Sequence, residues 1–291
     1  MKARLVILLA ASVTTLFAAQ QATFRSAVDV VVVDVSVRDR SKVVNGLGPA
    51  DFVVLDNGVR QTVSDVSFGA VPIDVTVALD VSGSIGAREL SMLRRAIGQL
   101  MKDLSHDDRV RLLLFNERVS RAVDFTANPV ELDTALSRAS GRGATSVIDA
   151  LSVALVSADQ PDRRQLVMFF TDGADTTSVT SAPVMLDLAR HSNAAVSAVM
   201  PAPGALVPRG RAEYVKVFEQ LAVVSGGVVV KQDPGKDLTA TFQRALDEFR
   251  MSYVLRYSPS GVKVKGDHVL EVAVGGRPGL TVRARRGYAV N

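Results

Sequence analysis

Short apolar runs alternate with amphipathic segments from residue 72 to residue 250. The apolar runs have the length of β-strands, and they lie at 73–79, 110–115, 166–170, 194–200 and 227–231, with a short edge strand expected near Val119. The segments between them have apolar residues at helical spacing, which predicts helices at 87–104, 129–139, 146–158, 183–191, 213–224 and 237–250. Strands that alternate with helices in this way predict an α/β fold: a doubly wound, mostly parallel sheet with helices on both faces.

The two ends of the chain have a different pattern, in which strands predominate. Strand-like segments lie at 28–37, 52–55 and 61–68 before the α/β region, and at 253–257, 269–274 and 280–285 after it. Asn57-Gly58 separates two of the first group and predicts a hairpin. Each flank is short for a domain of its own. We therefore expect residues 20–70 and 251–291 to pair into one small β-sandwich, with the α/β domain, residues 71–250, inserted between them.

The N-terminus has the pattern of an export signal. Lys2 and Arg4 precede an uncharged run from Leu5 to Ala19, which predicts a signal peptide over residues 1–19 and a periplasmic or secreted protein. The run is shorter than the roughly 20 apolar residues of a comfortable membrane span, and no other segment is long enough. An uncleaved anchor stays open as an alternative, since Phe17 is unfavourable three positions before a cleavage site after Ala19.

Composition narrows the class of protein. The 291 residues are 47% apolar and 22% charged, which is enough for a sizeable core. The chain has no cysteine, and this excludes disulfides, thiolate metal sites and a thiol-linked lipid anchor. The net charge of +4 is small, its only dense basic cluster is at 283–286, and there is no Trp. This pattern argues against nucleic-acid binding.

A cluster of oxygen-bearing side chains follows the strand 73–79. Asp80, Ser82 and Ser84 alternate on a turn that leads into a helix, Asp172 follows the strand 166–170, and Thr145 precedes the helix 146–158. The carboxyl ends of parallel strands meet at one edge of a sheet, so all five should lie close together. Two carboxylates about 5 Å apart repel each other by about 3 kcal/mol at an effective dielectric constant near 20, a cost that a divalent cation removes. Oxygen ligands suit Mg²⁺, which also keeps several waters.

The Asp-x-Ser-x-Ser turn, the Thr of a Gly-x-Thr turn and the Thr-Asp-Gly after an apolar strand resemble the von Willebrand factor type A domain. The resemblance covers roughly residues 72–250 and implies a metal-ion-dependent adhesion site at Asp80, Ser82, Ser84, Thr145 and Asp172. It further implies Mg²⁺, or Mn²⁺ or Ca²⁺, with an open position for an Asp or Glu of a partner protein. The role implied is metal-dependent binding or adhesion, without enzymatic turnover.

The flanks resemble bacterial exported proteins of the von Willebrand factor A-related type. The resemblance rests on the valine-rich first strand, on Gly-Leu-x-x-x-Asp-Phe at 46–52 and on Val-Arg-Ala-Arg-Arg-Gly-Tyr at 282–288. It implies β-rich segments on either side of the type A domain. The sequence does not identify the partner, the ion or the oligomeric state.

Three other interpretations of the cluster stay open. Ser82 and Ser84 could simply cap the following helix, with Asp172 in a turn. Ser84, Asp172 and His268 fall in the chain order of an α/β-hydrolase triad, although His268 lies in the terminal β region. The domain could also be a metal-independent interaction scaffold.

The segment from Pro201 to Arg211 is longer than a usual connection and should emerge at the same edge of the sheet as the cluster. We expect that Arg209 and Arg211 help to select an acidic partner there; a solvated loop without a role is the alternative.

Overall fold

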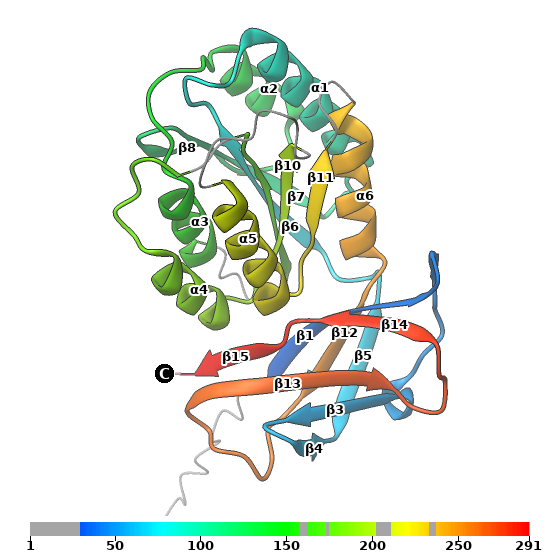
Figure 1. Ribbon diagram of the computed structural model, residues 1–291. Helices are drawn as coiled ribbons and strands as arrows, with labels where there is room; N and C mark the ends of the chain where they lie inside the picture. Colours follow the sequence, from blue (N-terminus) through cyan, green and yellow to red (C-terminus); the bar gives the residue numbers. More distant parts are fainter. Residues whose placement is uncertain (1–29, 158–161, 173–174, 202–210, 233–236, 291) are drawn as a thin grey trace, which may run out of the picture.

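A six-stranded sheet forms the centre of the larger part of the molecule (Figure 1). The computed structural model describes residues 30–157, 162–172, 175–201, 211–232 and 237–290. The strands lie in the order β11 (Val229–Gln232), β10 (Ala195–Pro201), β9 (Arg164–Phe170), β6 (Ile73–Asp80), β7 (Arg109–Phe115) and β8 (Val119–Thr126). All neighbours are parallel except β7 and β8. The predicted fold class, a doubly wound and mostly parallel sheet, is confirmed.

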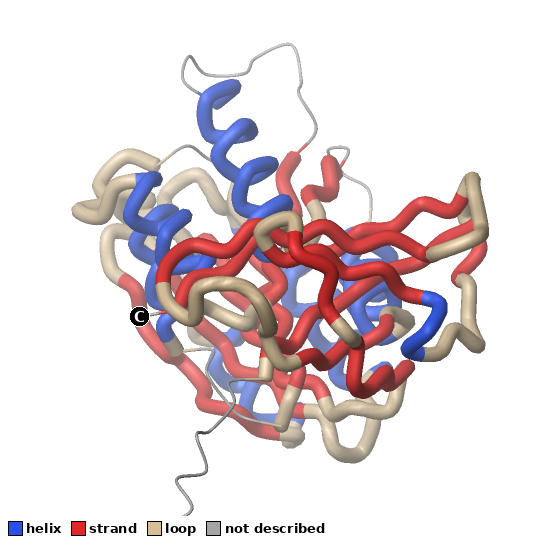
Figure 2. Tube along the Cα trace, turned by 90° about the horizontal axis from the view of Figure 1, so that it is seen from below, coloured by secondary structure: helices blue, strands red, loops and turns tan. Residues whose placement is uncertain are grey.

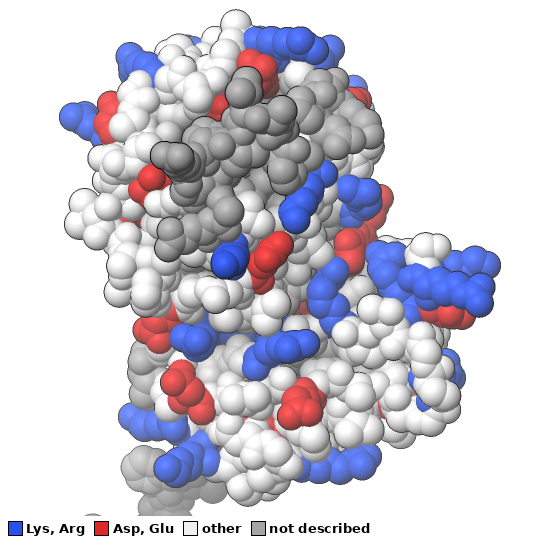
Figure 3. Space-filling view, in the orientation of Figure 1, with Lys and Arg blue, Asp and Glu red and all other residues white. Residues whose placement is uncertain are grey.

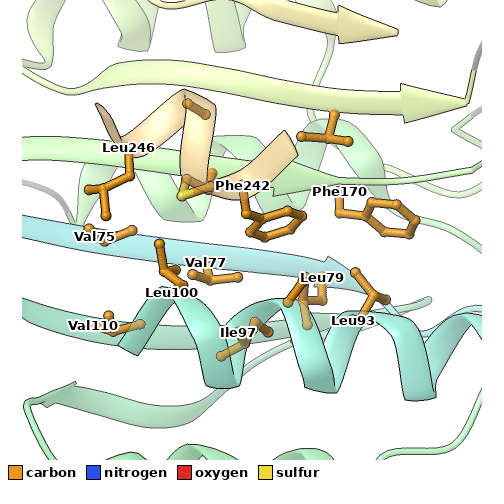
Figure 4. Close-up of a cluster of buried hydrophobic side chains, with 14 of the residues drawn as sticks. Val75, Val77, Leu79, Leu93, Ile97, Leu100, Val110, Phe170, Phe242 and Leu246 are labelled. Carbon is orange, nitrogen blue, oxygen red and sulfur yellow. The ribbon is translucent and has the colours of Figure 1, made fainter. Parts of the chain in front are cut away.

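Helices cover both faces of this sheet. They are α1 (Ala87–Asp103), α2 (Pro129–Ser137), α3 (Val147–Val156), α4 (Ala182–His191), α5 (Arg211–Ser225) and α6 (Leu238–Arg250). Side chains of α1, α2 and α6 pack on one face and those of α3, α4 and α5 on the other. Both faces are buried at the central strands, so apolar residues predominate in β6 and β9; in β6, Val75, Val77 and Leu79 face α1 and α6 (Figure 4).

The two flanks together form a β-sandwich, as predicted. One sheet has the order β14 (Leu280–Ala284), β1 (Val31–Asp39), β12 (Tyr253–Tyr257) and β5 (Val63–Phe68), with β2 (Lys42–Val43) beside β1. The other has the order β15 (Gly287–Val290), β13 (Gly266–Val274), β3 (Phe52–Asp56) and β4 (Val59–Gln61), and a 3-10 turn (Pro49–Asp51) precedes β3. N-terminal β1 and β3 pair with C-terminal β12, β14 and β13, so neither flank has a complete sheet alone. Figure 1 shows these strands gathered at the lower end of the molecule, and in Figure 2, which is seen from below, strands lie in front of the helices.

The predicted hairpin is confirmed, but its second strand differs from the prediction. Asn57 and Gly58 both have positive φ, 47° and 78°, as the tight turn between β3 and β4 requires. The segment 61–68, predicted as one strand, is divided at Thr62: β4 pairs with β3 in one sheet and β5 with β12 in the other. The pairing of β5 with β12 shifts register between Arg256 and Tyr257 of β12. These residues lie opposite the start of β5, where the chain passes from one sheet to the other.

Buried ion pairs join the α/β unit and the sandwich at the amino ends of the central strands. The guanidinium of Arg164 donates to Asp34 Oδ1 at 2.7 Å and to Ser252 Oγ at 2.6 Å. Nearby, buried Asp74 pairs with Arg109 at 2.7 Å and with Arg163 at 2.6 Å. Burial raises the pKa of Asp74, but these two arginines outweigh burial and leave the pKa below its ordinary value. The joint therefore lies at the end of the sheet opposite to the predicted site (Figure 1).

Two further predictions concern segments that lie wholly or partly outside the residues that the structure describes. The predicted signal peptide, residues 1–19, and residues 202–210 of the connection with Arg209 lie outside the described residues. Within the described part of the chain, no helix is long and apolar enough to cross a membrane.

Candidate metal centre

Asp80 ends β6 as a fully buried carboxylate. Its Oδ1 accepts a hydrogen bond from the Ser82 amide at 2.8 Å, and its Oδ2 accepts one from the Thr171 hydroxyl at 2.7 Å. Burial raises the pKa of Asp80; the bonds to Ser82 and Thr171 lower it, and the charge of Asp172 raises it again. The net pKa lies above its ordinary value, so the protein alone does not fully compensate this negative charge.

Ser82, Ser84 and Asp172 form a continuous chain of polar contacts beside Asp80. The hydroxyls of Ser82 and Ser84 lie 3.1 Å apart, and the Ser84 hydroxyl donates to Asp172 Oδ1 at 2.8 Å. Neither serine caps the following helix: α1 begins at Ala87 with Gly86 as its N-cap, and no side chain bonds to the cap. The interpretation of the two serines as helix caps is therefore wrong.

Thr145 lies on a neighbouring loop that packs directly on the Asp80–Ser84 turn. The amide of Gly83 donates to the carbonyl of Gly143 at 3.0 Å, and the Arg142 amide donates to the Val81 carbonyl at 2.9 Å. A side chain at Gly141 would place its Cβ 1.9 Å from the Ile85 carbonyl oxygen, so only glycine allows this approach. Among the described residues, no hydrogen bond joins the Thr145 hydroxyl to the other four side chains.

The segment after Asp172 holds the Thr145 loop in place, and sequence analysis missed the residues that do so. Thr176 and Thr145 exchange two bonds: the Thr145 amide donates to Thr176 Oγ1 at 2.9 Å, and the Thr176 amide donates to the Thr145 carbonyl at 2.8 Å. Asp175 accepts from the Ile148 amide at 2.8 Å at the first turn of α3. Asp149, within α3, accepts from the amides of Val179 and Thr180 at 2.9 and 2.8 Å. The run Asp-Thr-Thr-Ser at 175–178 is the signal that could have indicated this turn-forming role.

The donor set fits a hard divalent cation. Every candidate ligand offers oxygen, and the chain has no cysteine. The described residues contain no cluster of three or more His, Cys, Asp or Glu side chains, so a fully anionic cage is absent from them. Two carboxylates with neutral hydroxyls match a cation that keeps several waters, and the charge of Asp80 lacks full compensation without one.

A family model described as "von Willebrand factor type A domain" matches residues 75–174. This range includes Asp80, Ser82, Ser84, Thr145 and Asp172. The chain contains a von Willebrand factor type A domain. The inter-alpha-trypsin inhibitor heavy chain H4 of Sus scrofa is 26% identical over 125 residues, which are 39% of this chain and 14% of that protein. The chain therefore matches only a small part of this much longer relative.

Solved structures share the fold of the type A domain. Proximal thread matrix protein 1 of the mussel byssus is 15% identical with a TM-score of 0.53, over 67% of this chain and 50% of that one. A second structure of it, 16% identical with the same TM-score and the same coverage, is described as having a zinc-occupied MIDAS motif. The PilB minor pilin of Streptococcus sanguinis is 14% identical with a TM-score of 0.50, over 62% of each chain. At these identities the likeness concerns the fold alone.

The histidine of the predicted hydrolase triad, His268, lies outside the type A domain. His268 lies on β13 in the sandwich, 3% exposed, with Nδ1 2.7 Å from Asp56 Oδ1 and its ring stacked on Tyr288. Ser84 follows β6, whose carboxyl end points away from the sandwich (Figure 1), and its hydroxyl donates to Asp172. The structure thus brings Ser84 and Asp172 together but leaves His268 elsewhere.

Proposed function

We propose that the chain is a divalent-metal-dependent binding protein that engages an acidic group of a partner protein at the carboxyl end of its central sheet. Asp80, Ser82, Ser84, Thr145 and Asp172 would hold the ion, with Mg²⁺ as the first candidate and Mn²⁺ or Ca²⁺ as alternatives. When bound, the ion supplies an electrophilic position that a carboxylate oxygen of the partner can occupy. The role proposed is binding, without turnover.

One observation carries this proposal: buried Asp80 lies beside the contact chain of Ser82, Ser84 and Asp172. The Ser84 hydroxyl donates to Asp172 Oδ1 at 2.8 Å, and burial raises the pKa of Asp80. These groups are preorganised by strand ends and by the loop contacts of Gly83, Gly143 and Thr176. A structural neighbour described with zinc at its MIDAS motif adds Zn²⁺ to the ions worth testing.

We further propose that the protein is exported and that its domains divide near residues 20, 71 and 251. The basic start and apolar run at residues 1–19 support export to the periplasm or beyond, with cleavage or anchoring as alternatives. The pairing of β1 with β12 and β14 supports a type A domain inserted into a sandwich, since a free-standing flank would lack its neighbouring strands.

Thermal and chemical unfolding with added metal tests the proposal. At a hundredfold excess over its dissociation constant, Mg²⁺ should stabilise the wild type by about 2.7 kcal/mol. Asp172→Asn should abolish this gain, because it removes a charged candidate ligand that is partly exposed and whose loss should leave folding intact. Asp133→Asn is the matched control, since Asp133 is an exposed carboxylate paired with Arg94 on the α1–α2 surface.

A partner-capture experiment is the second stage of the test. Capture of a protein from the exported fraction should be lost with EDTA and with Asp172→Asn, and retained with Asp133→Asn. If no divalent ion stabilises the wild type, the metal site is rejected. If metal binds but capture survives both EDTA and Asp172→Asn, the metal-independent scaffold is the better description.

A further inference from the structure

A small cavity of about 20 Å³ lies where the type A domain meets the sandwich. Its walls come from β1 and β14 of the sandwich, and from α6, β10 and the turn between α5 and β11 of the type A domain. In Figure 1 these elements approach one another where the two units join, and Figure 3 shows basic and acidic side chains side by side at the surface of this junction. The cavity is thus separate from the candidate metal centre, which lies at the other end of the central sheet.

The sandwich turns a polar strand face toward this cavity. Val35 and Val37 of β1 point into the sandwich core. Asp34 and Ser36 alternate with them, so they point toward the type A domain. Arg283 of β14 is the direct cross-strand neighbour of Ser36 and lies on the same face. The sandwich therefore contributes a carboxylate, a hydroxyl and a guanidinium group to the lining.

Two ion pairs and a tight turn hold these walls in place. Nη2 of Arg283 lies 2.7 Å from Glu248 Oε1 on α6, and the guanidinium of Arg164 donates to Asp34 Oδ1 at 2.7 Å. In the turn before β11, a side chain at Gly227 would place its Cβ 1.9 Å from the carbonyl oxygen of the neighbouring strand β10. The lining is therefore fixed by contacts that cross the junction of the two units.

Three polar groups of the lining have no partner among the described residues. Arg283 is partly exposed, but its Nε atom is buried and no described atom accepts its hydrogen. Ser36 and Ser197 are 7% and 4% exposed, and no described residue bonds to either hydroxyl. Buried polar groups in folded proteins almost always have a hydrogen-bond partner. A donor and two hydroxyls around one cavity therefore point to a small polar ligand between them.

The volume and the charge balance fit one water molecule. A buried water needs a space of roughly 10–15 Å³ and roughly two to four polar partners, and the cavity of about 20 Å³ meets both conditions. The two ion pairs already balance their own charges, so neither a cation nor an anion gains from entering the site. A water can both accept from a guanidinium nitrogen and exchange bonds with hydroxyls, which an ion cannot do.

We propose that this cavity binds one water molecule, which accepts a hydrogen bond from Arg283 Nε and bonds to the hydroxyls of Ser36 and Ser197. Arg283 and Ser36 belong to the sandwich and Ser197 belongs to β10 of the central sheet, so the water joins the two units. It satisfies the three groups that protein atoms leave unpaired. No divalent ion takes part, so EDTA leaves the site unchanged.

The water can be observed directly in the wild-type full chain. A high-resolution crystal structure should show one ordered water within hydrogen-bond distance of Arg283 Nε and of at least one of the two serine hydroxyls. In solution, the Hε proton of Arg283 should show a cross-peak to a long-lived water by NMR. A site without water in both experiments would overturn the proposal. An anomalous signal at this position after rubidium soaking would identify a monovalent cation and equally overturn it.

Ser197→Val distinguishes a hydrated cavity from a dry one by the sign of its effect. Valine displaces the water and leaves Arg283 Nε and the Ser36 hydroxyl unpaired, so the unfolding equilibrium constant in urea should rise about fivefold, which corresponds to about 1 kcal/mol. In a dry cavity the added methyl group would fill a void, and the constant should fall.

Ser197→Ala is the matched control, because it removes the same hydroxyl and keeps room for the water. Its unfolding constant should rise less, by about twofold. A Ser197→Val protein that is more stable than both the wild type and Ser197→Ala would overturn the proposal. The crystal and NMR measurements use the wild type, so they decide the question even if a variant does not fold.

Discussion

Replacing Asp80 by Asn should stabilise the metal-free protein while destroying its response to metal. Asp80 is fully buried, and burial together with the charge of Asp172 raises its pKa. A carboxyl whose folded pKa lies above its unfolded pKa costs stability once both states are ionised. The wild type therefore loses stability, relative to the variant, as the pH rises from about 4 through the folded pKa.

The magnitude follows from charge and hydrogen bonding. Burial is the largest cause of the raised pKa of Asp80, and the charge of the partly exposed Asp172 is the smallest; taking a carboxylate out of water costs on the order of several kcal/mol, which the bonds from Ser82 and Thr171 partly offset. Asn can still accept the Ser82 amide bond, but its NH₂ group would meet Thr171, whose hydroxyl now donates to Asp80. Reversing that bond costs about 1 kcal/mol. We expect a net gain of about 1–2 kcal/mol at pH 7.

Urea unfolding in EDTA at pH 7 and pH 4 measures this difference. Asp80→Asn should unfold at higher urea than the wild type at pH 7, and the gap should shrink at pH 4 as Asp80 becomes protonated. With saturating Mg²⁺ the order should reverse, since only the wild type gains about 2.7 kcal/mol at a hundredfold excess over its dissociation constant. Asp133→Asn should follow the wild type throughout. A variant less stable than the wild type in EDTA at pH 7, or a gap that does not change with pH, would refute the electrostatic reasoning.

Three other predictions concern parts of the structure outside the candidate ligands. Thr176→Val removes the acceptor for the Thr145 amide, so metal affinity measured by calorimetry should fall roughly tenfold although no candidate ligand changes; unchanged affinity would show that Thr176 does not position the loop. Asp74→Asn should cost about 2 kcal/mol in urea unfolding at pH 7, because it removes the fully buried charge that pairs with the partly exposed Arg109 and Arg163. The pKa of Asp74 is lowered in the folded state, so its stabilisation is complete above about pH 4 and is lost as the pH falls further; the two proteins should converge there, and a constant gap would contradict this. Asp56→Ala removes the acceptor of two tyrosine hydroxyls and of His268, and should cost about 3–5 kcal/mol without changing Mg²⁺ affinity, which urea unfolding and metal titration on the same sample can test.

The central sheet could be predicted from sequence because its strands are buried on both faces. Val75, Val77 and Leu79 pack on α1 and α6, while Ala78 packs on the opposite helices, so β6 is mostly apolar although Asp74 and Thr76 interrupt the run. Strand order then placed Asp80 and Asp172 at one edge without any knowledge of side-chain contacts. β6 and β9 are direct neighbours; Asp80 is the last residue of β6, and Asp172 comes shortly after the end of β9.

Other features depend on partners distant in sequence and could not be predicted. The corner at Thr62 has no Gly or Pro to mark it; it arises because β4 and β5 find different partners, β3 and β12. The bonds of Asp149 to the amides of Val179 and Thr180 span about 30 residues, and only folded coordinates reveal them.

The two ends of the α/β unit differ in how their buried charges are compensated. At the carboxyl end of the central sheet, the buried charge of Asp80 remains undercompensated, so an ion and then an acidic ligand would complete it. At the amino end, the guanidinium of Arg164 donates to Asp34 at 2.7 Å where the type A domain meets the sandwich, so the two charges compensate each other. Divalent ions should therefore act on the first end and leave the second unchanged.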